Sequence, residues 1–241
     1  MANLPPISDE TLVVLKSIPT QTLIDGLWVK GWPMSYIEGA KPLQLGQHMA
    51  GRAVTLRFVP HRPDIVEDKP KGADSAEYVA IELCGPGEVL VIDALGWEYS
   101  SVGGDIKFLR MKQLNAGGLV TDGGVRDTVV LKEYGFPVYS ASATAKQGPA
   151  EFWPWQINDA IQCGGALVRP GDAVVGDDDG VVVVARSAVD EVIQIAHQRE
   201  EVEEVIKAQL EIEHCSPGKY YPFNEHTWQL YEEKTGKKKP S

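Results

Sequence analysis

The chain has 241 residues, of which 43% are hydrophobic, and it carries a formal net charge of −11. This length can bury a large core, no run of about 18 apolar residues predicts a membrane span, and so acidic a surface disfavours nucleic acid and anionic membrane as partners. The start, MANLPPISDE, lacks the basic and apolar segments of a signal peptide, and the three cysteines show no ligand-like spacing. We therefore expect a cytoplasmic protein with reduced thiols and no structural zinc.

Helical and strand patterns alternate along the first half of the chain. In order, they predict helices at 8–16 and 20–30, a strand at 51–58, a charged, proline-broken surface loop at 61–74, a helix at 75–83 and a strand at 89–94. Thr20 is a suitable N-cap for the second of these helices. The pattern is typical of an α/β protein rather than an all-helical one.

The second half continues the alternation and adds a cluster of short strands. It predicts a helix at 105–114, a strand at 118–121, a helix after Asp127, a strand at 136–139, two or three short strands at 165–187 and a long helix from 187 to about 213. Ser187 and Asp190 resemble a short capping box for this last helix. The aromatic segment YYPFNEHTWQLYEEK is expected to pack on the body or on a neighbouring subunit. We expect a compact, layered α/β domain whose topology the pattern alone leaves open.

An arginine and an aspartate, Arg126 and Asp127, stand side by side where a helix follows the strand in GGLVTDGGVRD. The simpler interpretation makes Asp127 an N-cap and Arg126 a surface residue, because aspartate suits the positive end of a helix. The functional interpretation makes them part of a site, since arginine pairs bidentately with carboxylates. Other parts of the chain decide between the two.

A second glycine-rich helix start, Gly103-Gly104-Asp105, belongs to the preceding unit of the chain. Free backbone N–H groups at a helix N-terminus bind small anions, so the amides of Ile106 and Lys107 are candidate donors to a carboxylate. The turn matches neither a dinucleotide-binding fingerprint nor a phosphate loop. If the two junctions meet, Asp105 and the aspartate of the next junction form the oxygen-rich site that Mg²⁺ or Mn²⁺ prefers.

A third candidate carboxylate lies on the long C-terminal helix. Glu203 falls on an otherwise apolar stripe at helical spacing, with Glu200 close beside it. A carboxylate there is costly unless it is paired or faces a cation, although a glutamate at the edge of such a stripe can also extend into solvent. The five histidines share no ligand spacing. We expect Trp153 and Trp155 to pack in the core, with lining of a pocket as the alternative.

Taken together, these motifs resemble the RraA-like family, which includes 4-hydroxy-4-methyl-2-oxoglutarate / 4-carboxy-4-hydroxy-2-oxoadipate aldolases and a non-catalytic regulator of ribonuclease E. The resemblance covers most of the chain, from TQTLIDGL through GRAVTLRF, GPGEVLVIDALG, GGLVTDGGVRD and YGFPVYS to VRPGDAVVGDDDGVVVV. The spacing of 21 residues from Asp105 to Arg126 agrees with the aldolases. The resemblance implies a layered β/β/α core of the swivelling phosphohistidine type, with flanking terminal helices, as one domain over 1–241.

The resemblance also implies roles for the candidate residues. Asp127 would bind Mg²⁺ or Mn²⁺ directly, Asp105 would hold metal-bound water, and Arg126 would stabilise the enolate of a pyruvyl group. The turn at Gly104, with the amides of Ile106 and Lys107, would hold the pyruvate carboxylate. Glu203, or alternatively Glu200, would complete the water shell from an adjacent subunit.

Two functions follow as expectations. The first is a metal-dependent lyase that releases pyruvate from a 4-hydroxy-2-oxo acid and also decarboxylates oxaloacetate; it would form trimers or hexamers with sites between subunits, and residues 187–241 would contact a neighbour. The second is a non-catalytic regulator that binds a protein partner. Lys107 departs from the aldolases' apolar residue, so its side chain is expected either to face solvent or to reach a second substrate carboxylate.

Overall fold

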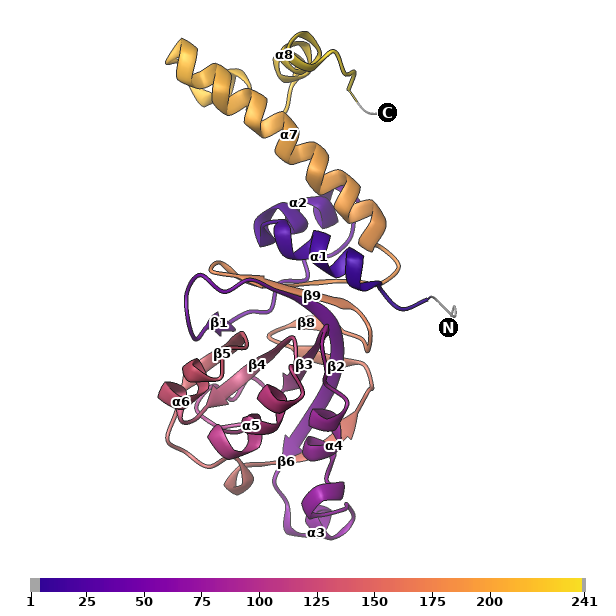
Figure 1. The fold of residues 1–241 in the computed structure, drawn as a ribbon, viewed down its shortest axis with the longest axis vertical. Coiled ribbons are helices and arrows are strands. Elements are labelled where there is room, and N and C mark those ends of the chain that lie inside the picture. The colour runs from indigo at the N-terminus through magenta and orange to yellow at the C-terminus, as the bar shows by residue number, and fades with distance from the viewer. Residues whose placement is uncertain (1–4, 240–241) are drawn as a thin grey trace.

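A mixed eight-stranded sheet forms the centre of the computed structural model, which describes residues 5–239 (Figure 1). Its main path runs β1-β5-β4-β3-β2-β9-β10, and β6 pairs with β2 beside it; β7 and β8 form a separate two-stranded sheet. The strands are β1 (Lys41–Pro42), β2 (Met49–Pro60), β3 (Glu88–Asp93), β4 (Gly118–Val125), β5 (Val138–Ala143), β6 (Phe152–Ile157), β7 (Ile161–Cys163), β8 (Ala166–Val168), β9 (Ala173–Asp177) and β10 (Gly180–Val184).

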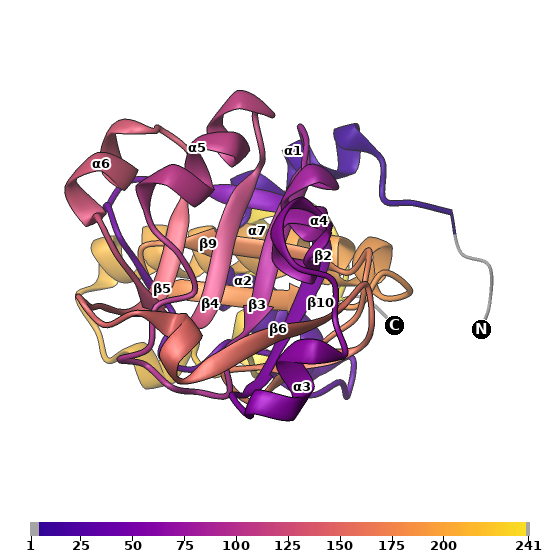
Figure 2. The ribbon, with the colours of Figure 1, turned by 90° about the horizontal axis from the view of Figure 1, so that it is seen from below.

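Strands β2, β3, β4 and β5 are parallel neighbours, so their carboxyl ends meet at one edge of the sheet. Parallel strands need crossover connections, and helices supply them here. These are α4 (Ala76–Glu82), α5 (Asp105–Gln113) and α6 (Thr128–Glu133). The three lie side by side, with α5 between the other two (Figure 2). Both proposed ligand-binding junctions therefore open at the same edge.

Buried apolar clusters separate the layers. One cluster, which includes Leu90, Phe108 and Leu119, lies between the parallel strands and α4–α6. A second, with Val91, Val120 and Tyr139, lies on the other face of these strands. A third joins β9 and β10 to the helices α1 (Asp9–Ser17), α2 (Thr20–Val29) and α7 (Val189–Glu213). This is the layered α/β arrangement with flanking terminal helices that the sequence predicts.

Several local predictions are wrong in instructive ways. Thr20 does not cap α2; its amide and hydroxyl both donate to Asp177, at 2.8 Å each, so a carboxylate from β9 performs the capping. Ser187 does not cap α7, whose N-cap is Ala188 without a side-chain bond. The predicted surface loop at 61–74 contains α3 (Pro63–Glu67) and a 3₁₀ turn (Gly72–Asp74). Strands β1, β6 and β7 were not predicted.

The C-terminal part extends away from the sheet. Figure 1 shows the outer half of α7 projecting from the body with α8 (Glu225–Thr235) packed beside it. A small core of its own joins these two helices, formed by Val202, Ile206, Tyr220, Leu230 and Tyr231. The aromatic segment therefore packs on α7 of its own chain. Within residues 5–239, no helix is long and apolar enough to cross a membrane.

Candidate active site

The two glycine-containing junctions meet at the carboxyl edge of the parallel strands. The Asp105 amide donates to Asp127 Oδ2 at 3.2 Å, and the Arg126 amide donates to the Gly103 carbonyl at 2.9 Å. Residues 102–104 thus run alongside the end of β4, where Val102 also donates to the Gly124 carbonyl at 2.9 Å. The structure brings Asp105, Arg126 and Asp127 together at one point.

Asp127 turns its carboxylate back toward the glycine turn. It occupies the N-cap position of α6, but its φ of 56° lies in the left-handed region and its side chain makes no capping bond to α6. A Cβ placed on Gly104 would lie well inside the 3.0 Å limit of real Cβ contacts from Asp127 Oδ2. The interpretation of Asp127 as a simple cap of its own helix is therefore wrong, and Gly104 is the residue that leaves space for its carboxylate.

The N-terminus of α5 binds carboxylates within the chain itself. Asp105 Oδ1 accepts from the Ile106 amide at 2.6 Å, and Asp127 Oδ2 accepts from the Asp105 amide. The positive end of the helix macrodipole favours both contacts. Asp105 thus stands where an incoming carboxylate would meet the Ile106 amide. These contacts show that this helix start accepts anionic oxygen.

Tyr134 is a residue of this site that the sequence reasoning missed. Its hydroxyl donates to the Asp105 carbonyl at 3.0 Å. Burial, together with the charges of Asp105 and Asp127, raises the pKa of the phenol. Its spacing of two helical turns from Asp127 places it on the same side of α6, and that spacing was the available signal.

Lys107 does not face solvent, and its side chain points away from the two aspartates. Its ammonium group forms an ion pair with Glu77 of α4 and donates to the Val102 carbonyl at 3.0 Å. Both ionic side chains are less than one-fifth exposed. Only its backbone amide, in the first turn of α5, lies where the sequence analysis placed a carboxylate-binding group.

The glutamates of the C-terminal helix are remote from this point in the same chain. Figure 1 places α7 at the opposite end of the molecule from α5 and α6. Glu203 lies 3.8 Å from Arg199, which is held by Asp25 of α2 at 2.6 Å, and Glu200 lies 3.9 Å from His197. Neither glutamate can therefore join Asp105 and Asp127 within one chain.

The donor set suits a hard cation in part. Two adjacent carboxylates provide the oxygen ligands that Mg²⁺ or Mn²⁺ prefers, and these ions commonly keep several waters. Within the described residues, no group of three or more His, Cys, Asp or Glu converges to hold a metal. One chain thus offers Asp127 and Asp105 as the protein share of a largely hydrated site.

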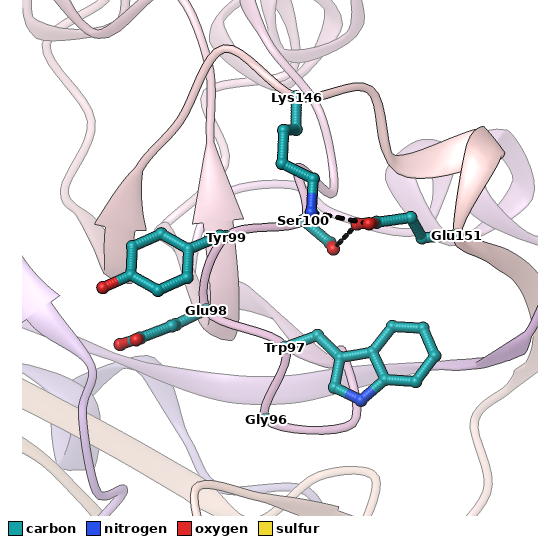
Figure 3. A pocket seen from close by; sticks show the side chains of 7 residues that line it. All are labelled: Gly96, Trp97, Glu98, Tyr99, Ser100, Lys146 and Glu151. Carbon is teal, nitrogen blue, oxygen red and sulfur yellow. Dashed lines mark hydrogen bonds and ion pairs between the residues drawn. The ribbon is translucent and has the colours of Figure 1, made fainter.

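An open pocket of about 520 Å³ lies at the start of the loop that ends in this glycine turn (Figure 3). Trp97, Glu98 and Tyr99 line one part of it. On another side, Glu151 forms an ion pair with Lys146 at 2.6 Å and accepts a hydrogen bond from Ser100. These hydrogen bonds lower the pKa of Glu151. The loop from Gly96 to Asp105 therefore connects a polar pocket to the paired carboxylates.

Asp122 of β4 fixes the beginning of this loop. Its buried carboxylate accepts from the amides of Ala94, Gly96 and Gly164 and from the Gln162 side chain, at 2.7–3.2 Å.

Asp122→Asn would turn an amide donor toward these donors, so we expect the free energy of unfolding to fall by about 2–4 kcal/mol. Urea denaturation measures this. The exposed Asp159→Asn serves as control, and equal stability of the two variants would contradict the assignment.

Comparison with known proteins identifies the family of the chain. The profile of the RraA-like family (Aldolase/RraA) matches residues 20–183. The chain belongs to the RraA-like family. A Halalkalibacterium halodurans protein named "Putative 4-hydroxy-4-methyl-2-oxoglutarate aldolase" is 31% identical over 189 residues, which is 77% of this chain and 81% of that protein. A Cupriavidus necator protein of the same name is 34% identical over 135 residues, 56% of this chain and 73% of the relative.

A solved RraA-like structure extends the likeness to the fold. Streptomyces coelicolor RraAS2, described as an unusual member of the RNase ES inhibitor RraA protein family, superposes with a TM-score of 0.75 at 32% identity, covering 83% of this chain and 97% of RraAS2. The expected fold class is thus confirmed. Relatives in the RraA-like family therefore carry both aldolase and inhibitor names, so family membership alone does not assign a function to this chain.

Proposed function

We propose that this RraA-like protein is a divalent-metal-dependent lyase that cleaves a 4-hydroxy-2-oxo acid and releases pyruvate. The observation that carries the proposal is the meeting of the two junctions: the Asp127 carboxylate accepts from the Asp105 amide at the start of α5, and the Arg126 amide donates to the Gly103 carbonyl. The aldolase names of relatives at 31% and 34% identity support the same chemistry. When bound, Mg²⁺ or Mn²⁺ would supply Lewis-acid stabilisation of the developing enolate.

The residues of the chain have distinct proposed tasks. Asp127 holds the cation directly, and Asp105 orients its water. Arg126 contacts the keto oxygen. Its positive charge stabilises the transition state, because negative charge develops on that oxygen as the bond breaks. Among the described residues its guanidinium has no hydrogen-bond or ion-pair partner, so it is available to a substrate. The amides of Ile106 and Lys107 at the Gly104 turn hold the pyruvyl carboxylate, which takes the place of the Asp105 side chain at the Ile106 amide.

A panel of 2-oxo acids with pyruvate detection by coupled lactate dehydrogenase tests the function. We expect pyruvate release from a 4-hydroxy-2-oxo acid, with oxaloacetate as a second substrate, because CO₂ can replace the carbonyl fragment as the leaving group. Activity should fall to background with EDTA and return with added Mg²⁺. Turnover that is indifferent to EDTA would exclude the proposed chemistry.

The likeness to RraAS2 favours one second candidate, a regulator that binds a ribonuclease. This function needs no metal and no pair of carboxylates at the start of α5. Stoichiometric binding of a ribonuclease together with absence of turnover on every 2-oxo acid of the panel would favour it over the lyase.

We further propose a homo-oligomer, a trimer or hexamer, in which α7 of one subunit brings Glu203 to the site of the next. Ile106 and Val129, which flank the site, are 81% and 73% exposed in the single chain, as suits residues covered by a neighbour. Glu203 cannot reach the site within its own chain. Residues 187–241 would thus serve as the contact arm.

Subunit mixing tests this sharing. Asp127→Ala and Glu203→Ala variants should each be inactive, but co-refolded mixtures should regain about one quarter of wild-type activity, because random cyclic assembly pairs one intact Asp127 with one intact Glu203 at that frequency. Mixing with Glu200→Ala tests the alternative glutamate in the same way. Inactive mixtures of two folded variants would contradict a site shared between subunits, and an active Glu203→Ala variant would exclude Glu203 from the site.

A further inference from the structure

The side chain of Lys107 turns back toward the loop that precedes its own helix. Lys107 lies in the first turn of α5, and its ammonium group donates to the carbonyl of Val102 at 3.0 Å. The same ammonium group is paired with Glu77 of the neighbouring helix α4, and both of these side chains are less than one-fifth exposed. Lys107 is thus committed to contacts within the chain rather than to a substrate carboxylate.

Net stability is a poor explanation for this ion pair. A cation in the first turn of a helix is opposed by the positive end of the helix macrodipole. Removing two charges from water is also costly, so a buried ion pair often stabilises a fold no more than two apolar side chains of similar volume would. What the pair does provide is direction, because Glu77 fixes where the ammonium group of Lys107 can donate.

The carbonyl that receives this bond begins the glycine turn of the candidate site. The amide of Val102 donates to the Gly124 carbonyl of β4, and the Arg126 amide donates to the Gly103 carbonyl, each at 2.9 Å. The Ser101 hydroxyl also donates to the Gly103 carbonyl at 2.9 Å. These bonds join the turn to the end of β4. The bond from the lysine holds the opposite side of the turn, toward α4.

The aliphatic part of Lys107 also packs against the turn. A Cβ placed on Gly103 would lie 2.9 Å from Lys107 Cδ and 2.6 Å from Cζ of the fully buried Phe108, inside the 3.0 Å limit of real Cβ contacts. The turn is therefore held between β4 and the first side chains of α5. The next residue, Gly104, lies directly against the Asp127 carboxylate, so a shift of the turn would displace that carboxylate.

We propose that Lys107 is a positioning residue of the candidate site, with Glu77 as its partner. Its ammonium group fixes the Val102 carbonyl and with it the turn at Gly104, so that the Asp127 carboxylate keeps the position from which it holds a cation. The consequence for metal binding rests on the proposed lyase function. The fixing of the turn does not depend on that function and is measured without metal.

A double variant, Lys107→Met with Glu77→Met, tests the proposal in the full-length protein. It removes both charges at similar side-chain volume, so it should melt within a few degrees of the wild type. Without metal, the amides of Val102 and Arg126 should exchange their hydrogens about tenfold faster or more, because the turn has lost one of its holds. Mn²⁺ binding, followed by electron paramagnetic resonance, should weaken by about 10–100-fold.

The matched control is Arg110→Met with Glu82→Met. Arg110 and Glu82 form an exposed ion pair between the same two helices, α5 and α4, at 2.8 Å. Its removal should leave the amide exchange of the turn and the affinity for Mn²⁺ unchanged. Lys107→Met alone is a second variant. It leaves the Glu77 carboxylate unpaired, so it should melt lower than the double variant and show the same faster exchange.

Three results would overturn the proposal. The first is unchanged amide exchange of the turn in both Lys107 variants. The second is an equal effect of the Arg110 control, which would make the Lys107 pair a simple link between α4 and α5. The third is faster exchange with normal Mn²⁺ affinity, in a protein whose Asp127→Ala variant loses the ion.

Failure of the lyase function would give a different result. The wild type and Asp127→Ala would then bind Mn²⁺ alike, which removes the cation site itself. Amide exchange in the metal-free double variant and its Arg110 control would still decide whether Lys107 fixes the turn.

Discussion

Asp127→Ala is expected to reduce pyruvate release by about a thousandfold or more, because it removes the only carboxylate proposed to hold the cation directly. The structure gives Asp127 no alternative structural task in α6, since its side chain makes no capping bond there. Its one protein hydrogen bond, from the Asp105 amide, is an exposed contact. The variant should therefore fold and assemble normally.

The measurement is kcat/KM on the best 2-oxo acid of the panel, with thermal melting as the check on folding. Arg126→Ala is the companion variant, expected to lose about 10²–10³-fold in kcat through the missing contact to the enolate oxygen. Asp159→Ala, in an exposed loop, is the control for loss of an acidic side chain. Near-normal kcat/KM in the Asp127→Ala variant would show that catalysis does not need a cation held by Asp127.

Gly104→Ala is expected to reduce kcat/KM by about a hundredfold or more, although no residue with a functional group changes. The backbone of Gly104 has φ −148°, which alanine adopts readily, so no conformational strain is introduced. The added methyl group would instead overlap the Asp127 carboxylate and displace it. The defect is therefore expected in metal affinity and turnover rather than in stability.

Gly218→Ala provides the matched control, because a Cβ there meets nothing closer than 3.5 Å. The two variants should melt within a few degrees of each other, while only Gly104→Ala requires much more Mg²⁺ for half-maximal activity. Normal metal dependence of Gly104→Ala would show that the position of the Asp127 carboxylate seen here is unimportant for catalysis.

The periodicity of the chain predicts most of the fold because hydrophobic spacing is a local property. The helices at α1, α2, α5 and α7 and the strands at β2, β3, β9 and β10 each begin or end within a few residues of their expected positions. Strand β6, with two tryptophans and a proline, was missed because its only pairing is with the distant β2. Long-range pairing of this kind has no local signal.

The site shows the same division between local and long-range information. Glycine-rich helix starts indicate where a ligand can approach the backbone, and they predict Gly104, Asp105 and Asp127 as candidate site residues. Asp177, which caps α2, lies 157 positions from Thr20 in the sequence. Glu77, which pairs with Lys107, lies 30 positions from it. Spacing along the sequence cannot supply those partners. Tyr134 was missed although its helical spacing from Asp127 was visible.

Equilibrium binding of Mn²⁺, followed by electron paramagnetic resonance, tests most directly whether the two junctions hold one cation beside a 2-oxo acid. We predict one Mn²⁺ per subunit, tighter binding when oxalate is added as a mimic of the pyruvate enolate, and loss of this site in both Asp127→Ala and Gly104→Ala. Mn²⁺ binding that is unchanged in these two variants, or that oxalate does not strengthen, would contradict the account.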